Sequence, residues 1–264
     1  AWHPSNEYLL GTVSEDCYGR IWSIPEGGLT ENIEEPVQVL SGHKRKIGTM
    51  AFHPVANNIV ATTSADYTVK IWDIESGDAV LNVDGHGDLI QSAAWNKNGS
   101  EFVTSCKDKK LRIIDPRGQS IASEWGGHQG VKGSRAMWLT DKNWVFSVGF
   151  TRTSEREFNI WDPRSLDKPM KHVNVDSASG ILMPFYDEDS RMVYLAGKGD
   201  GNIRYYEVVD EDPYIHYLTE FKTSSPQRGM TFIPKRAVNV GATEVMRALK
   251  VTPTAVEPIS FTVP

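Results

Sequence analysis

Hydrophobic residues in this chain gather in short runs that polar and glycine-rich segments separate. Within residues 42–84 such runs cover 47–52, 58–63, 68–72 and 79–83, with a His-Pro pair after the first run. The runs are rich in β-branched and aromatic residues, and Asn, Gly, Asp or Pro stands at their boundaries, as is typical of strands joined by tight turns. The pattern predicts a four-stranded antiparallel meander in this part of the chain.

A marker at the end of the third predicted strand recurs along the sequence. It is a large aromatic or aliphatic residue, and it stands at Trp22, Trp72, Ile114, Trp161 and Tyr206. The steps between these positions are 50, 42, 47 and 45 residues, which is the period of a WD-type propeller blade. The sequence therefore predicts an all-β WD40-type β-propeller, with about six blades represented here in whole or part and seven in the complete protein.

The ends of the chain and one insertion depart from the regular repeat. Residues 25–36 lengthen the first step and are expected to form a loop between a third and a fourth strand. Residues 1–4 align with residues 51–54, so the chain is expected to start inside a blade, as a fragment of a longer protein. The expected organisation is propeller blades over residues 1–227, then a divergent last blade with the start of a C-terminal extension over 228–264.

Composition and charge narrow the class of protein. No uninterrupted apolar stretch reaches the roughly 18 residues of a membrane span, and no signal-peptide pattern opens the chain, which indicates a soluble intracellular protein. Cys17 and Cys106 fall in different repeats and are expected to be reduced thiols in the core. The net charge of −6 argues against general binding of nucleic acid or anionic membranes.

The chain contains the residue types of a hydrolase triad, namely His43, Ser64 and Asp66. Four repeats nevertheless carry an aspartate six residues before their marker: Asp16, Asp66, Asp108 and Asp200. Because the aspartate belongs to the repeat, we expect a structural tetrad, in which hydrogen bonds run from the Trp72 indole through Ser64 and His43 to Asp66. No catalytic residue is expected, and the chain is not expected to be an enzyme.

Histidine and glycine patterns could also suggest a metal or a phosphate site. Gly-His pairs recur at residues 42, 85 and 127, but each lies in a different repeat, so a shared metal ion is not expected. The Gly-rich segment 197–201 is expected to be a turn between strands, because no helix-forming segment follows it. No cofactor is expected.

Two basic clusters allow two interpretations. They contain Lys44, Arg45 and Lys46 in the first, and Lys107, Lys109, Lys110 and Arg112 in the second. They could form charged edges that limit aggregation between strands, or an electrostatic patch for the acidic surface of another protein. The sequence alone does not decide whether the two clusters share a face.

Several short runs together resemble the coronin family over essentially the whole chain. These runs are residues 41–46, 106–110, 113–117, 153–156, 182–187, 197–207 and 226–230. The resemblance implies an actin-filament-binding protein with a seven-bladed propeller, a divergent extension beneath it and a C-terminal coiled coil. It implies filamentous actin as the partner, the basic clusters as candidate contacts, and the cytoplasm, the actin cytoskeleton and the cell cortex as the location.

The resemblance also implies functions for regions that this chain does not contain. The coiled coil would oligomerise the protein and help to engage the actin-branching complex, so the present fragment, which has no heptads, is expected to be monomeric. The alternative function is a general WD-repeat adaptor for another protein complex. That function predicts a peptide-binding central channel and indifference to filamentous actin.

Overall fold

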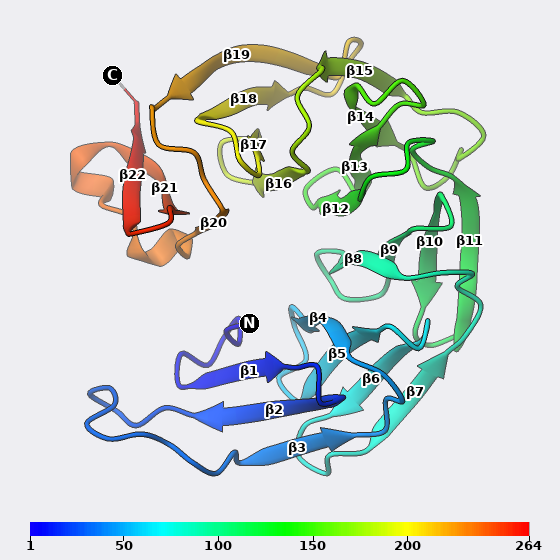
Figure 1. The fold of residues 1–264 in the computed structure, drawn as a ribbon, viewed down its shortest axis with the longest axis vertical. Coiled ribbons are helices and arrows are strands. Elements are labelled where there is room, and N and C mark those ends of the chain that lie inside the picture. Colours follow the sequence, from blue (N-terminus) through cyan, green and yellow to red (C-terminus); the bar gives the residue numbers. More distant parts are fainter. Residues whose placement is uncertain (264) are drawn as a thin grey trace. The chain divides into compact units, whose positions relative to one another are not determined.

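The computed structural model describes residues 1–263, which form antiparallel β-sheets and two short 3-10 helices. The chain divides into two compact units, one of residues 1–129 and 133–145 and the other of residues 130–132 and 146–264. Within each sheet the strands pair in sequence order (Figure 1). Each connection within a sheet is therefore a link between antiparallel neighbours, which short turns can make.

Three sheets lie within the first unit. The first sheet contains β1 (Leu9–Val13), β2 (Tyr18–Ser23) and β3 (Gln38–Ser41). The second contains β4 (Ile47–Phe52), β5 (Ile59–Ser64), β6 (Val69–Asp73) and β7 (Ala79–Val83). The third contains β8 (Ile90–Trp95), β9 (Phe102–Cys106), β10 (Lys110–Asp115) and β11 (Ser120–Gly126).

The remaining strands form three further sheets along the chain. The next sheet contains β12 (Arg135–Leu139), β13 (Trp144–Phe150), β14 (Arg156–Trp161) and β15 (Lys171–Asp176). It is followed by β16 (Leu182–Asp187), β17 (Met192–Gly197), β18 (Asn202–Val208) and β19 (Ile215–Lys222). The last sheet contains β20 (Gly229–Phe232), β21 (Glu244–Val251) and β22 (Val256–Thr262), and the helices η1 (Lys235–Ala237) and η2 (Val240–Ala242) lie between β20 and β21.

The strand prediction for residues 42–84 is confirmed. Strands β4 and β7 have the predicted bounds, and β5 and β6 begin and end one residue later than predicted. Residues 25–36 lie between β2 and β3 and contain no strand, as expected. The Gly-rich segment 197–201 forms the turn between β17 and β18, which is also the predicted structure.

Buried side chains from neighbouring sheets form a continuous core in the first unit. Val69, Ile71 and Leu81 of the second sheet belong to the same cluster as Trp95 and Phe102 of the third. Strand β9 is buried at every position, so both of its faces are covered. Two covered faces explain why the strand contains no charged residue, and its two polar side chains, Thr104 and Ser105, are small and buried.

A histidine before a proline joins each of the first two sheets to the sheet that follows. The Nδ1 atom of His53 accepts hydrogen bonds from the backbone N–H groups of Val55 and Ala56, at 3.1 and 2.8 Å. Its Nε2 atom lies 3.1 Å from the carbonyl oxygen of Gly99, to which it donates, since Nδ1 is already an acceptor. His3 forms the equivalent bonds one repeat earlier, which agrees with the alignment of residues 1–4 with 51–54.

The two cysteines occupy different environments. Cys106 is buried in β9, as expected for a core thiol. Cys17 is only half-buried and lies in the turn between β1 and β2 with a φ of 73°, so its assignment to the core was wrong. Within residues 1–263 no helix has the length and hydrophobicity needed to cross a membrane.

Replacing Trp72 with alanine should lower the free energy of unfolding by about 3–5 kcal/mol, because the indole is fully buried and its removal leaves a cavity. Urea denaturation of the variant and the parent protein measures this difference. Trp2→Ala is the matched control, since the Trp2 side chain is 59% exposed and should contribute far less. An unchanged urea midpoint for Trp72→Ala would contradict the assignment of Trp72 to the core.

Candidate interaction surface and its supporting polar network

The first basic cluster lies in the connection between β3 and β4. Lys44, Arg45 and Lys46 are all exposed, while His43 before them and Ile47 after them are buried. The buried residues anchor both ends of the loop and direct the three basic side chains to solvent. The loop also packs on the turn between β5 and β6, because the Ala65 N–H donates to the Lys46 carbonyl oxygen at 2.9 Å.

The second basic cluster forms the turn between β9 and β10 and the start of β10. Lys107, Lys109 and Lys110 are exposed. This turn is the structural equivalent of the β5–β6 turn on which the first cluster packs. The two clusters therefore lie at the same end of neighbouring sheets in the first unit.

Arg112 does not belong to this surface, and its assignment as a candidate contact was wrong. Its side chain is 2% exposed and lies between two carboxylates: Nη2 is 2.6 Å from Asp108 Oδ2, and Nε is 2.8 Å from Glu124 Oε2. Position 112 is inside β10, between Thr104 of β9 and Glu124 of β11, so it has a paired strand on each side. The burial of an arginine at this position requires paired carboxylates, which the sheet supplies.

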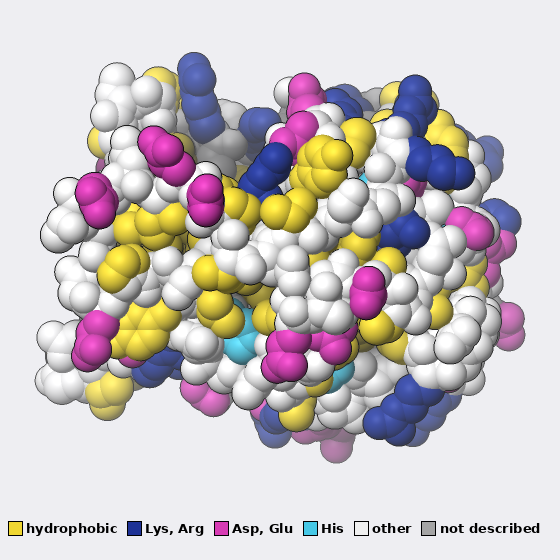
Figure 2. Space-filling view, turned by 90° about the horizontal axis from the view of Figure 1, so that it is seen from below, with side chains coloured by type: hydrophobic (Ala, Val, Ile, Leu, Met, Phe, Trp, Pro, Cys, Tyr) yellow, Lys and Arg dark blue, Asp and Glu magenta, His cyan; other side chains and the backbone are white. Residues whose placement is uncertain are grey.

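The exposed basic residues differ in how far their charges are neutralised. Lys46 Nζ lies 3.0 Å from Glu15 Oε1, Lys110 pairs with Glu124, and Lys107 is 3.9 Å from Asp88 Oδ2. Among residues 1–263, the side chains of Lys44 and Arg45 form no ion pair. On the face shown in Figure 2, acidic, basic and hydrophobic side chains are interspersed. Lys44 and Arg45 are thus the cations of this loop that remain available to a partner.

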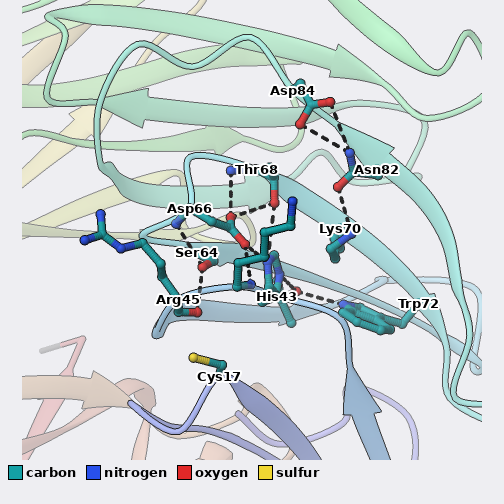
Figure 3. Close-up of polar contacts among 12 residues, drawn as sticks. Cys17, His43, Arg45, Ser64, Asp66, Thr68, Lys70, Trp72, Asn82 and Asp84 are labelled. Carbon is teal, nitrogen blue, oxygen red and sulfur yellow. Dashed lines mark hydrogen bonds and ion pairs between the residues drawn. The ribbon is translucent and has the colours of Figure 1, made fainter.

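The polar network beneath the first cluster includes His43, Asp66 and Trp72 (Figure 3). It is a tetrad, but its hydroxyl is not the expected one. The Trp72 indole N–H donates to Thr62 Oγ1 at 2.8 Å, and the same oxygen lies 2.8 Å from His43 Nε2. His43 Nδ1 is 2.9 Å from Asp66 Oδ2. Thr62, and not Ser64, therefore completes the chain from indole to carboxylate.

Ser64 lies at the end of β5, where it serves the turn instead. Its hydroxyl donates to the carbonyl oxygen of Arg45 at 2.8 Å and accepts from the Asp66 N–H at 3.1 Å. Thr62 and Ser64 point to the same face of the strand, since side chains alternate with a period of two. Only Thr62 lies deep enough in that face to meet both the indole and the imidazole.

A signal for the threonine was present in the sequence. A threonine stands ten residues before the marker in four repeats: Thr12, Thr62, Thr104 and Thr151. The Trp22 indole donates to Thr12 at 2.8 Å, and His86 Nε2 lies 2.9 Å from Thr104 Oγ1. In the first three of these repeats the spacing identifies the hydroxyl that is used, whereas in the fourth the Trp161 indole donates to Ser147 at 2.9 Å.

Hydrogen bonds hold Asp66 in its ionised form. Burial by itself would raise the pKa of this carboxyl, but bonds from the Lys44 N–H, the Thr68 hydroxyl and N–H, and His43 lower it well below its usual range. Burial also lowers the pKa of His43, so the imidazole is neutral and donates from Nδ1 to Asp66. The bond from the Lys44 backbone fixes the start of the basic loop to this carboxylate.

In the third sheet, the residues that correspond to Asp66 and His43 are Asp108 and His86, and they have different hydrogen-bond partners. Asp108 accepts from both terminal nitrogens of Arg112, at 3.2 and 2.6 Å, and also accepts from the N–H of Gly87 at 3.1 Å. Within residues 1–263 the buried Nδ1 atom of His86 has no hydrogen-bond partner. Burial and the nearby Arg112 cation lower the pKa of His86 to about 4.

A family model described as WD domain, G-beta repeat matches residues 34–73 and 77–115. The crystal structure of the WD40 domain from Toxoplasma gondii coronin is similar to this chain with a TM-score of 0.95 and 33% identity, over 100% of this chain and 68% of that chain. Coronin-A from Dictyostelium discoideum is 60% identical over 264 residues, the whole of this chain. The chain belongs to the coronin family.

The coronin chain has the all-β WD40 propeller fold that its repeat predicted. It spans 59% of the length of Coronin-A. The number of blades in the complete protein, seven by the sequence argument, stays a prediction.

A buried arginine that the sequence analysis did not single out crosslinks two sheets in the second unit of this coronin. Arg156 in β14 donates to both oxygens of Asp176 and to Asp200 Oδ2, each at 2.6 Å, and to the carbonyl oxygen of Gly180 at 3.2 Å. Its partners lie 20 to 44 residues away in the sequence, so no local spacing reveals them. The cluster is fully paired and serves packing.

Among residues 1–263, no group of three or more His, Cys, Asp or Glu side chains is placed to hold a metal ion. His43 and His86 of this coronin each contact the threonine of their own sheet, at 2.8 and 2.9 Å. These nitrogens are used in the polar networks.

Replacing Thr62 with valine should lower the free energy of unfolding by about 2–3 kcal/mol, because the Trp72 N–H and His43 Nε2 both lose a buried partner. Thr62→Ser keeps the hydroxyl and should cost much less. Urea denaturation of both variants gives the comparison. A loss in Thr62→Val no larger than the loss in Thr62→Ser would contradict the role assigned to the hydroxyl.

Acidification from about pH 7 to about pH 4.5 should destabilise this coronin, because burial lowers the pKa values of His43, His53 and His86 in the folded state. In this range the unfolded chain binds protons that the folded chain does not, so the free energy of unfolding falls as the pH falls. A folded pKa of about 4 for His86, against 6.5, corresponds to about 3 kcal/mol.

Urea titrations at a series of pH values measure this dependence. The variant His86→Gln has lost one of the titrating groups, so its stability should change less steeply with pH than that of the parent protein. An identical slope in the two proteins would contradict the proposed role of His86.

Proposed function

We propose that this coronin chain binds filamentous actin as a non-catalytic scaffold, in the cytoplasm and at the actin cytoskeleton of the cell cortex. The observation that carries the proposal is the exposed basic loop of residues 44–46 beside the basic turn of residues 107–110, at one end of neighbouring sheets. Membership of a family of actin-binding proteins supports the choice of partner. The loop would dock against an acidic surface of the filament.

Two features of the basic loop suit it to this function. The side chains of Lys44 and Arg45 form no ion pair within residues 1–263, so no internal salt bridge has to break when a partner binds. The backbone beneath them is held by two hydrogen bonds: the Lys44 N–H donates to Asp66, and the Ser64 hydroxyl donates to the Arg45 carbonyl oxygen. A loop that is already ordered loses little conformational entropy on binding.

The absence of catalysis is part of the proposal, and the geometry of the tetrad supports it. The His43 side chain is fully buried, and its two nitrogens contact Thr62 and Asp66. Ser64, the candidate nucleophile, donates its proton to a backbone carbonyl group. A base that is buried and a hydroxyl that faces the backbone are poorly placed to meet a substrate.

A general adaptor for another protein complex is the second candidate. It is favoured by an apolar pocket at the opposite end of the second and third sheets, lined in part by Trp95, Ile71 and Val80. Such a protein would bind a peptide and would be indifferent to filamentous actin.

Oligomerisation through a coiled coil and engagement of the actin-branching complex also belong to this proposal. The chain spans 59% of the length of Coronin-A, and we assign both functions to a C-terminal region of the complete protein. The fragment by itself is proposed to be monomeric.

Replacing Lys44, Arg45 and Lys46 with glutamate should weaken binding to filamentous actin about tenfold at low salt, since an exposed ion pair contributes roughly 0.5 kcal/mol. Co-sedimentation with actin filaments over a salt series measures the affinity, and the difference should shrink as the salt concentration rises. The thermal melt should stay unchanged because all three side chains are exposed.

Arg117→Glu is the control for a change of charge alone, because Arg117 follows β10 at the end opposite to the basic turn. It should leave actin binding unchanged. If the parent protein is folded and does not pellet even at low salt, the adaptor function is the better assignment. If it pellets and the triple variant pellets equally, residues 44–46 are not part of the contact.

A further inference from the structure

A pocket of about 460 Å³ lies between the second and third sheets of the first unit. Its walls include Ile59 and Ile71 of the second sheet and Trp95 of the third, and Leu81 of β7 closes one side. The turns β4–β5, β8–β9 and β10–β11 surround it. These turns are at the opposite end of the sheets from the basic loops, so the pocket is separate from the proposed actin surface.

Two exposed valines stand at the pocket. Val55 in the β4–β5 turn is 66% exposed, and Val80 on β7 is 54% exposed. Apolar walls with exposed apolar residues beside them are characteristic of sites that bury part of a ligand. The volume is large enough for one or two apolar side chains.

The rim of the pocket is held rigidly. His53 packs edge-on against Trp95, with the ring centroids 4.8 Å apart, and its Nε2 donates to Gly99 in the β8–β9 turn. The same imidazole accepts from the Val55 and Ala56 N–H groups. The Trp95 indole N–H donates to the carbonyl oxygen of Ala51 at 3.1 Å. The pocket is therefore formed before a ligand arrives, which reduces the entropic cost of binding.

A cation without an internal partner lines the same pocket. Arg117 follows Asp115 and Pro116 in the β10–β11 turn, and Asp115 Oδ1 accepts the Arg117 N–H at 2.9 Å. Arg164 occupies the same position in a second Asp-Pro-Arg turn, where its guanidinium folds back on Asp162 at 2.7 Å. Among residues 1–263, the Arg117 guanidinium forms no such ion pair.

The charge of the pocket determines which ligands suit it. Arg117 is the only charged residue in the described lining, which contains no aspartate or glutamate, although the chain as a whole carries a net charge of −6. An acidic ligand would gain a charge-assisted hydrogen bond here, and a basic ligand would meet the unpaired guanidinium.

We propose that this pocket binds a short peptide segment of a partner protein, in which an aliphatic or aromatic side chain stands next to a carboxylate. The apolar side chain enters between Val55 and Val80 and packs on Trp95. The carboxylate pairs with Arg117. This binding does not depend on the proposed binding of actin, because it uses the other end of the sheets.

The proposal can be tested with the full-length protein and three fluorescein-labelled pentapeptides, by fluorescence polarisation. The probe has the sequence Gly-Asp-Leu-Asp-Gly, and the two comparison peptides replace either both aspartates with lysine or the leucine with glycine. The probe should bind more tightly than both comparison peptides. Arg117→Ala and Val80→Asp should each weaken its binding about tenfold.

The chain provides matched controls for both variants. Arg164→Ala removes the arginine of the equivalent turn, and Val39→Asp changes an exposed valine of the outer strand β3. Both should bind the probe as the parent protein does. The triple glutamate variant at residues 44–46 should also bind it normally, which separates this proposal from the actin hypothesis.

Three results would overturn the proposal. The first is no detectable binding of the probe, and the second is equal binding of the three peptides. The third is binding that appears only when the residues after 264 are removed, which would assign the pocket to a segment of the protein's own chain.

Discussion

One buried hydroxyl joins four parts of the second sheet. Thr62 Oγ1 meets the Trp72 indole on the third strand and the His43 imidazole from the loop before the sheet, and His43 in turn meets Asp66 in the β5–β6 turn. Each of these polar groups is buried or partly buried, so each needs a partner. The shared hydroxyl supplies it, and the same contacts set the position of the exposed loop that follows His43. The core and the candidate actin surface thus depend on one network.

Neighbouring repeats satisfy the same constraint with different side chains. In the third sheet Ile114 replaces the indole and Arg112 takes both oxygens of Asp108, and among residues 1–263 one nitrogen of His86 has no hydrogen-bond partner. The neutral form of His86 is favoured there, since its cation would be desolvated beside Arg112. One pattern of residues therefore supports a fully paired tetrad in one sheet and a buried arginine pair in the next, with different dependence on pH.

The two ends of the sheets have different chemistry. The loops and turns at one end present lysine and arginine side chains, and the turns at the other end surround an apolar pocket with a single cation. The networks of His43 and His53 hold the backbone at the two ends, so each surface is formed in the free protein. Under the two proposals, the partners would bind at opposite ends of the sheets, and neither would block the other.

The sequence by itself determined the repeat and hence the fold, because the spacing of the markers and the punctuation of the strands are local properties of the chain. It also identified His43, Asp66 and Trp72 as members of one network. The tertiary structure decided which residues lie close together. Thr62, and not Ser64, belongs to the network because it lies deeper along β5. Arg112 is not part of the exposed surface because its side chain is buried in the sheet. The Arg156 crosslink and the pocket beside Arg117 likewise depend on contacts between distant segments, which local patterns do not encode.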